Sequence, residues 1–162
     1  MYLRKYQESD FHILNNWVTD PDTLFRFSGS AWSYPLSYEQ LKKFYQTNPF
    51  RFPYLAFSDD NSPVAFGEII SGDSHTPRLG RLLVGNRDSR GKGLGQEFVY
   101  IMIKECQKLL DPDKIHLFVL EDNFPAIRCY EKIGFIFDSE VQITETFNGE
   151  QKSILLMTLT LK

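Results

Sequence analysis

The sequence has few cysteines and no long hydrophobic run, and each absence excludes a class of protein. Its two cysteines, Cys106 and Cys129, both fall within helical patterns, so neither a disulfide framework nor a zinc site is expected. No apolar run reaches the roughly 18 residues that a membrane-spanning helix needs, and no charged and apolar leader precedes the first pattern. We therefore expect no membrane association, no bound metal and, by default, a cytoplasmic location.

Low-complexity tracts and internal repeats are also absent. Apolar residues make up 42% of the sequence, which is typical of a globular domain. A chain of 162 residues is long enough to bury one hydrophobic core of ordinary size. We expect a single domain spanning residues 1–162.

The net charge is small but unevenly distributed. It totals −3, yet residues 78–92 carry a local charge of +4, so the remainder of the chain carries −7. The basic residues of that stretch are Arg78, Arg81, Arg87, Arg90 and Lys92. This distribution favours a site for one anionic ligand on an acidic body, and it argues against nucleic-acid binding, which requires a broader basic face.

A glycine-rich turn joins an extended apolar run to an amphipathic helix. Residues 79–84 are apolar and end at Gly85-Asn86, which predicts a strand, and apolar residues then recur with helical spacing over residues 94–109. Because glycine costs about 0.5–1 kcal/mol relative to alanine inside a helix, three glycines at the start of a helix need a reason. Backbone N–H groups that approach a phosphate at a helix N-terminus provide one.

Two familiar phosphate-binding motifs do not match this turn. A P-loop requires Ser or Thr after its lysine, but Gly93 follows Lys92. A dinucleotide-binding fingerprint requires a third glycine where this chain has Gln96 or Phe98. A different order, R-x-x-G-x-G, is present as Arg90, Gly93 and Gly95.

A second motif follows the next predicted strand. The pattern N-x-x-A-x-x-x-Y-x-K-x-G-F is complete, with Asn123, Ala126, Tyr130, Lys132, Gly134 and Phe135. Together the two motifs cover about residues 78–135, and the chain resembles the GCN5-related N-acetyltransferase (GNAT) family. Within it, Leu3-Arg4, Ser9-Asp10, Leu14 and Trp17 resemble the branch of ribosomal-protein N-terminal acetyltransferases.

The remaining patterns predict the order of helices and strands. Strands are expected at 1–6, 52–57, 64–70, 79–84, 115–120, 135–146 and 151–161, and helices at 11–18, 37–46, 94–109 and 125–133. Residues 24–35 show no period and are expected to form an aromatic-rich connection. The resemblance implies the α/β GNAT fold, a mixed and mostly antiparallel sheet of six to seven strands with helices on both faces. In that fold the central strand and the next one splay apart.

The resemblance also implies a site for acetyl-CoA. Its pantetheine arm and acetyl carbonyl would contact the backbone of Leu82, Leu83 and Val84, and its diphosphate would bind the turn formed by Arg90, Gly91, Lys92, Gly93, Leu94 and Gly95. Asn123 would reach the cofactor arm, or it would cap the following helix, or both.

Tyr130 matches the family position that faces the sulfur of coenzyme A. Full proton transfer from a phenol with a pKa near 10 to a thiolate with a pKa near 8.5 is uphill by roughly 2 kcal/mol. We therefore expect Tyr130 to donate a hydrogen bond that stabilises the leaving sulfur. Alternatively, Tyr130 only packs under the sheet and has no role in the reaction.

The general base is open to two interpretations. Removing a proton from an alkyl ammonium at pH 7 costs about 4–5 kcal/mol, so such an acceptor needs a base or a desolvating pocket. Glu68, beside the central strand, is the candidate base, directly or through water, and an ordinary strand carboxylate is its alternative. His75 is a second candidate.

The resemblance implies an acetyl-CoA-dependent N-acetyltransferase in which a primary amine attacks the thioester directly in a ternary complex. The amine would belong to a small molecule or a protein N-terminus. An acetyl-cysteine route is disfavoured because Cys129 is adjacent to Tyr130 and would point elsewhere. The alternatives are a noncatalytic acyl-CoA-binding or sensor domain and a nucleotide-binding protein with a phosphate loop. Dimers are common in the family, so a homodimer stays an open expectation.

Overall fold

A seven-stranded mixed sheet runs through the centre of the computed structural model, which describes residues 1–72, 75–86, 88 and 91–162. The strand order is β1-β2-β3-β4-β5-β7-β6. The strands are β1 (Tyr2–Lys5), β2 (Arg51–Phe57), β3 (Pro63–Ile70), β4 (Arg78–Val84), β5 (Lys114–Leu120), β6 (Ile136–Phe147) and β7 (Glu150–Thr160). The β4–β5 pair is parallel and the other pairs are antiparallel, as the resemblance implied.

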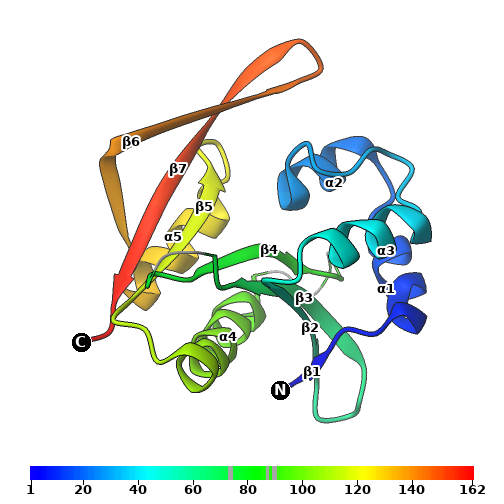
Figure 1. Ribbon diagram of the computed structural model, residues 1–162, viewed down its shortest axis with the longest axis horizontal. Helices are drawn as coiled ribbons and strands as arrows, with labels where there is room; N and C mark the ends of the chain where they lie inside the picture. The colour runs from blue at the N-terminus through cyan, green and yellow to red at the C-terminus, as the bar shows by residue number, and fades with distance from the viewer. Residues whose placement is uncertain (73–74, 87, 89–90) are drawn as a thin grey trace.

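Helices cover both faces of the sheet, and each face has its own hydrophobic cluster (Figure 1). Helices α4 (Leu94–Leu110) and α5 (Phe124–Ile133) pack on one face through residues such as Phe98 and Met102. A 3-10 turn (Glu8–Asp10) leads into the helices of the other face, which are α1 (Phe11–Trp17), α2 (Pro21–Ser28) and α3 (Tyr38–Thr47). None of the helices in the described ranges has both the length and the apolar character to cross a membrane.

Helix α2 corrects part of the prediction of an irregular connection over residues 24–35, since residues 24–28 belong to this helix. Asp20 caps this helix, because its Oδ1 accepts a hydrogen bond from the backbone N–H of Thr23 at 2.7 Å and Pro21 occupies the first turn. Asp20-Pro21 therefore begins a helix and does not merely end the previous one. The other predicted helices and strands begin and end within one residue of the observed ones.

Strands β4 and β5 separate after a short stretch of pairing. Their register includes only Arg78 with His116 and Leu79 with Leu117, whereas β5 pairs with β7 along its whole length, from Lys114 to Leu120. The β3–β4 ladder is also irregular beside this point, where Arg81 has a φ of 48°. The sheet therefore divides into two parts that diverge from the Arg78 end of β4, as expected from the resemblance.

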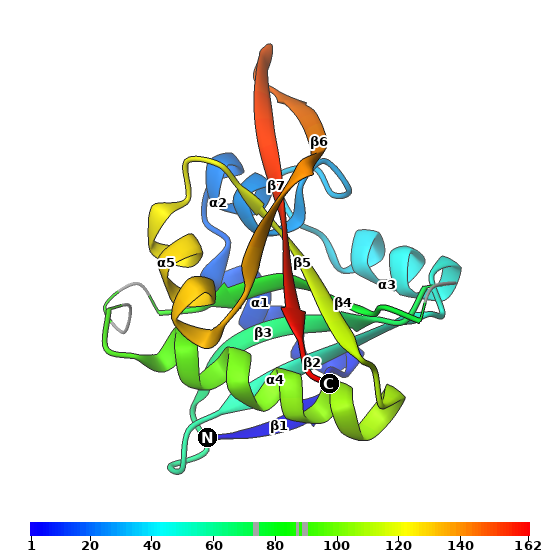
Figure 2. The ribbon, with the colours of Figure 1, turned by 90° about the vertical axis from the view of Figure 1, so that its left-hand side faces the viewer.

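The β6–β7 hairpin reaches across to α2 from the far edge of the sheet (Figure 2). The ring of Phe147, near its tip, stacks on Phe25 with centroids 4.4 Å apart. The carboxylate of Glu145 accepts a hydrogen bond from the backbone N–H of Ser30 at 3.2 Å. Two segments more than a hundred residues apart thus meet beside the divergent strands.

Candidate active site

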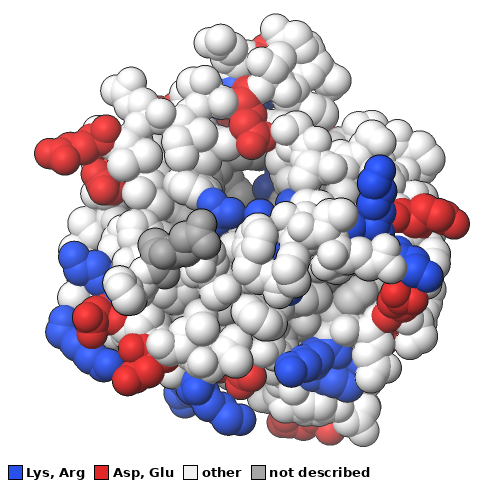
Figure 3. Space-filling model, viewed as in Figure 1, with Lys and Arg blue, Asp and Glu red and all other residues white. Residues whose placement is uncertain are grey.

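A cleft of about 440 Å³ lies where β4 and β5 separate. Its walls come from α2, β4, β5, α5 and the β6–β7 hairpin, and the space-filling view shows a hollow with basic side chains inside it (Figure 3). Of the sequence-predicted residues, Leu82, Asn123 and Tyr130 line it. The lining also includes four arginines, a phenylalanine and a glutamate, which are Arg26, Arg51, Arg78, Arg81, Phe118 and Glu145.

The glycine turn at the start of α4 is open. Gly91 and Gly93 have φ values of 79° and 82°, which L-residues rarely adopt, and a Cβ atom added at either position would meet no atom of the described residues within 4 Å. Gly93 is the N-cap of α4, so its missing side chain cannot accept a hydrogen bond from the N–H groups of the first turn. No described side chain fills the turn, and Lys92 beside it is exposed.

This turn adjoins the end of β4. A Cβ atom added at Gly95 would lie 3.7 Å from Cγ2 of Val84, so the predicted diphosphate turn and the predicted pantetheine strand are neighbours. Leu82 faces the cleft, while Leu83 is buried in the cluster on the α1–α3 face. Arg90, the remaining residue predicted for this turn, lies outside the described residues.

Tyr130 lies on the cleft wall but is almost fully buried, with 8% of its surface exposed. Its ring packs edge-on against Phe135, with centroids 6.0 Å apart. Burial raises the pKa of the Tyr130 phenol well above its usual value. The hydroxyl therefore stays protonated at physiological pH and can act as a hydrogen-bond donor in the cleft.

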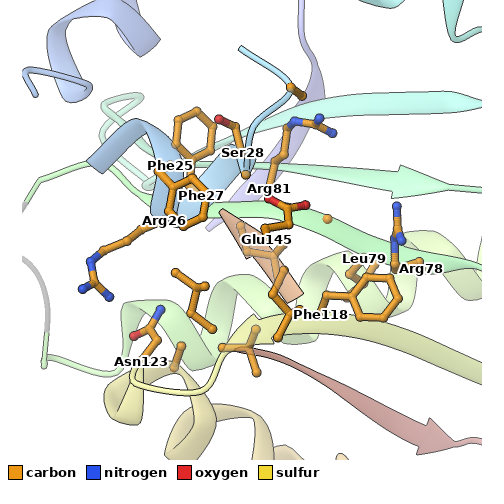
Figure 4. Close-up of a pocket in the computed structure, with 18 of the residues that line it drawn as sticks. Phe25, Arg26, Phe27, Ser28, Arg78, Leu79, Arg81, Phe118, Asn123 and Glu145 are labelled. Carbon is orange, nitrogen blue, oxygen red and sulfur yellow. The ribbon is translucent and has the colours of Figure 1, made fainter. Parts of the chain in front are cut away.

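Asn123 precedes α5 at the cleft wall. It occupies the N-cap position, and its backbone carbonyl oxygen accepts a hydrogen bond from the backbone N–H of Ile127 at 3.0 Å. Its side chain makes no capping hydrogen bond. The amide is therefore available to a ligand (Figure 4), and the helix-cap interpretation holds only for the backbone.

Glu68 does not line the cleft wall. Its side chain is completely buried, and Oε1 accepts a hydrogen bond from the Tyr45 hydroxyl at 2.5 Å. Oε2 accepts hydrogen bonds from Nη1 of Arg51 at 2.8 Å and Nη1 of Arg81 at 2.9 Å. This arrangement favours the alternative of a structural carboxylate, because both oxygens are engaged by donors beneath the cleft surface.

The other candidates for proton transfer or covalent chemistry lie elsewhere. His75 is exposed in the loop before β4 and does not line the cleft. Cys129 is also absent from the lining, and burial raises the pKa of its thiol, which disfavours a thiolate nucleophile.

Sequence reasoning missed the role of three arginines. It grouped Arg78 and Arg81 with the phosphate turn, but both line the cleft, Arg78 at the first residue of β4 and Arg81 at its middle. Arg51, from β2, is linked to Arg81 through Glu68. The positions of Arg78 and Arg81 within the predicted strand, before Gly85, could have separated them from the turn, whereas no sequence signal marks Arg51, or Glu145 on the opposite wall.

Comparison with known proteins gives one family. A model of the acetyltransferase (GNAT) family matches residues 11–135. A spermine/spermidine N(1)-acetyltransferase of Bacillus subtilis strain 168 is 36% identical over 73 residues, which are 45% of this chain and 45% of that protein. A probable spermine N(1)-acetyltransferase of Bacillus subtilis subsp. natto is 37% identical over 62 residues, 38% of each chain. The chain thus matches less than half the length of either relative.

Solved structures extend the likeness to the whole fold. The crystal structure of a Vibrio cholerae spermidine N-acetyltransferase in complex with CoA and spermine superposes with a TM-score of 0.80. The superposition covers 98% of this chain and 94% of the Vibrio cholerae chain, and the two sequences are 17% identical. These relatives are named for polyamines, so they lend no support to the finer resemblance to ribosomal-protein N-terminal acetyltransferases.

Proposed function

Because the chain belongs to the acetyltransferase (GNAT) family, we propose that it transfers the acetyl group of acetyl-CoA to a primary amine. One observation carries the proposal beyond family membership. Asn123 and Tyr130 line the cleft that opens where β4 and β5 diverge, and the open glycine turn adjoins the Val84 end of β4, an arrangement that supports a cofactor site there.

Acetyl-CoA, when bound, supplies the activated acetyl group. The N–H groups of the first turn of α4 would bind its diphosphate, with Lys92 adding positive charge. The backbone of residues 82–84 would hold the pantetheine arm, and Asn123 would hydrogen-bond to the same arm from the opposite wall. Open backbone at the turn fits this ligand, since side chains there would collide with it.

In the proposed mechanism the amine attacks directly, and Tyr130 donates a hydrogen bond to the sulfur as the carbon–sulfur bond breaks. Glu68 acts as a positioning residue, because it holds Arg51 and Arg81 at the cleft floor. Among the described acidic residues, Glu145 lines the cleft, so it is the carboxylate placed to receive the amine.

The acceptor amine could be a polyamine or a protein N-terminus. Polyamines are the first acceptors to test because two curated relatives are named for them, although each alignment covers less than half of the relative. A protein N-terminus needs less help, because an α-amino group near pKa 7.8 loses its proton at a cost of about 1 kcal/mol at pH 7.

The test is an assay of free thiol released from acetyl-CoA with a panel of primary amines. We expect thiol release that depends on the amine, and a matching acetylated product by mass spectrometry. A noncatalytic acyl-CoA-binding domain predicts a different pair of results: acetyl-CoA binds, but no amine releases thiol and Tyr130→Phe changes nothing.

A further inference from the structure

The end of the cleft where β4 and β5 still pair is basic. Arg78 and Arg81 of β4 and Arg51 of β2 all line it. In Figure 4, Arg78 and Phe118 lie at the opposite end of the cleft from Arg26 and Asn123. Since Asn123 and the glycine turn belong to the proposed cofactor end, the arginines belong to the part that an acceptor occupies.

This cluster has more positive charge than its own carboxylate neutralises. Arg51 and Arg81 share the single carboxylate of Glu68, with Nη1–Oε2 distances of 2.8 Å and 2.9 Å. Arg78 has no carboxylate within salt-bridge distance among the described residues, and its guanidinium lies 4.7 Å from the ring centroid of Phe118. Burial, then repulsion from Arg51 and Arg81, lower the pKa of Arg78.

Two N–H donors of these guanidinium groups have no hydrogen-bond acceptor among the described residues. Within the described part of the chain, Nε of Arg51 and Nε of Arg81 are buried without a hydrogen-bond acceptor. The side chain of Arg81 is 92% buried and lies 4.5 Å from the ring centroid of Phe44, so it is fixed in place. These Nε atoms are buried beneath the cleft surface, so the support for binding an oxyanion comes from the cleft-lining cation of Arg78, which has no counter-ion among the described residues.

Arg26 provides an internal contrast. It lines the same cleft, but it forms ion pairs with Asp22 at 2.9 Å and with Asp122 at 3.2 Å. Its charge is therefore satisfied within the protein. Arg78 has the same side chain and the same cleft but lacks such partners among the described residues.

We propose that Arg51, Arg78 and Arg81 form an oxyanion subsite, and that the acceptor is an amine carrying a carboxylate or a phosphate. This inference rests on the proposed acetyl transfer and names the acceptor class of that site. The oxyanion binds at the arginine end, and the amine extends along the cleft toward Tyr130 and the thioester. A polyamine places a second positive charge against the same arginines, which opposes binding.

The experiment compares amines matched in length and different in charge. Butylamine, 4-aminobutanoate and putrescine carry neutral, anionic and cationic ends, and ethanolamine with O-phosphoethanolamine adds a phosphate arm. We expect kcat/KM for an anionic acceptor to exceed that of its neutral partner by roughly 10-fold to 100-fold, as charge-assisted hydrogen bonds do. The arm with the larger gain distinguishes carboxylate from phosphate.

Substitutions test whether the arginine cluster causes the preference for anionic acceptors. Arg78→Gln should reduce the anionic preference to a few-fold or less, and Arg78→Lys, which keeps the charge, should retain part of it. Arg26→Gln is the matched control, and it should leave the preference unchanged because Asp22 and Asp122 already neutralise that arginine.

A binding measurement separates this inference from the catalytic proposal. Calorimetry with the CoA-loaded protein compares N-acetyl-4-aminobutanoate with N-butylacetamide, the corresponding products. Tighter binding of the anionic product supports the subsite even if no amine releases thiol, a result that would count against acetyl transfer alone. Equal binding of the two products, or a higher kcat/KM for putrescine or spermidine than for 4-aminobutanoate, overturns the subsite and leaves acetyl transfer standing.

Discussion

The two ends of the cleft are built by different parts of the chain and by different chemistry. The proposed cofactor end would use backbone from two neighbouring stretches, residues 82–84 and 91–95, and its key positions would be glycines. The arginine end uses side chains from β2 and β4 around a carboxylate of β3. A ligand part shared by a whole family can be bound by backbone, whereas a variable part requires side chains.

The largest expected effect tests the arginine end through its carboxylate. Glu68→Gln removes the counter-ion of two buried arginines, so we expect the free energy of unfolding to fall by about 3–5 kcal/mol, measured by urea denaturation. Asp10→Asn is the control, because Asp10 is a buried partner of Arg4 outside the cleft. It should lower stability without changing the KM for the acceptor. Full stability of Glu68→Gln combined with loss of kcat would instead restore Glu68 as the base.

Tyr130→Phe tests the point where the two ends meet. We expect kcat to fall about 100-fold with little change in the KM for acetyl-CoA, because the lost hydrogen bond forms to the leaving sulfur. Tyr54→Phe is the control, since that buried hydroxyl donates to Glu105 outside the cleft. Equal activity of the two variants would leave Tyr130 a packing residue.

The pH profile of the wild type gives a second measurement of the same group. Burial raises the pKa of Tyr130, so its proton is lost only above the usual tyrosine range near 10. The rate should therefore rise with pH as the acceptor amine loses its proton, with no decline up to about pH 10. A decline near pH 8 would show that a different acid is required.

Gly93→Val tests the backbone chemistry of the cofactor end. At a φ of 82° a β-branched residue is strained, and its side chain would enter the open turn, so we expect the KM for acetyl-CoA to rise about 10-fold, with a loss of stability of about 1–3 kcal/mol. Gly149→Val is matched, because Gly149 has a φ of 76° and equally open surroundings in the β6–β7 turn. It should lose comparable stability and retain its affinity for acetyl-CoA.

The smallest effect concerns Asn123. Because its side chain makes no capping hydrogen bond, Asn123→Ala should cost less than about 0.5 kcal/mol of stability, while the KM for acetyl-CoA rises about 3-fold. Ser37→Ala is the contrast, since Ser37 caps α3 by accepting the N–H of Gln40, and it should cost about 1 kcal/mol. A comparable loss of stability in both variants would make Asn123 a structural residue.

Much of the fold could be predicted from the sequence because local rules agree with the tertiary structure. Alternating strands, capped helices and the Asn148-Gly149 turn each determine their own conformation. The prediction failed at residues 24–28, which continue a helix that begins at Pro21, because Asp20-Pro21 can mark both the end of one helix and the cap of the next. Such a signal has two meanings until packing decides between them.

The candidate site could be predicted only in part, for a related reason. A motif preserves spacing along the chain, so the glycine turn, Asn123 and Tyr130 could be proposed together as a cofactor site. The partners of Glu68 depend on strand register and on where β3 and β4 become irregular. These are long-range properties, and therefore a carboxylate expected to accept a proton is found between two arginines.

The contact between the hairpin and α2 limits the shape of what can enter. Phe147 on Phe25 and Glu145 on Ser30 join the two walls of the cleft, like a strap across an opening. We therefore expect a slender amine or an extended chain end to enter beneath this contact, and the surface of a folded protein to be excluded. The width of an acceptor should thus limit its entry before its charge affects its binding.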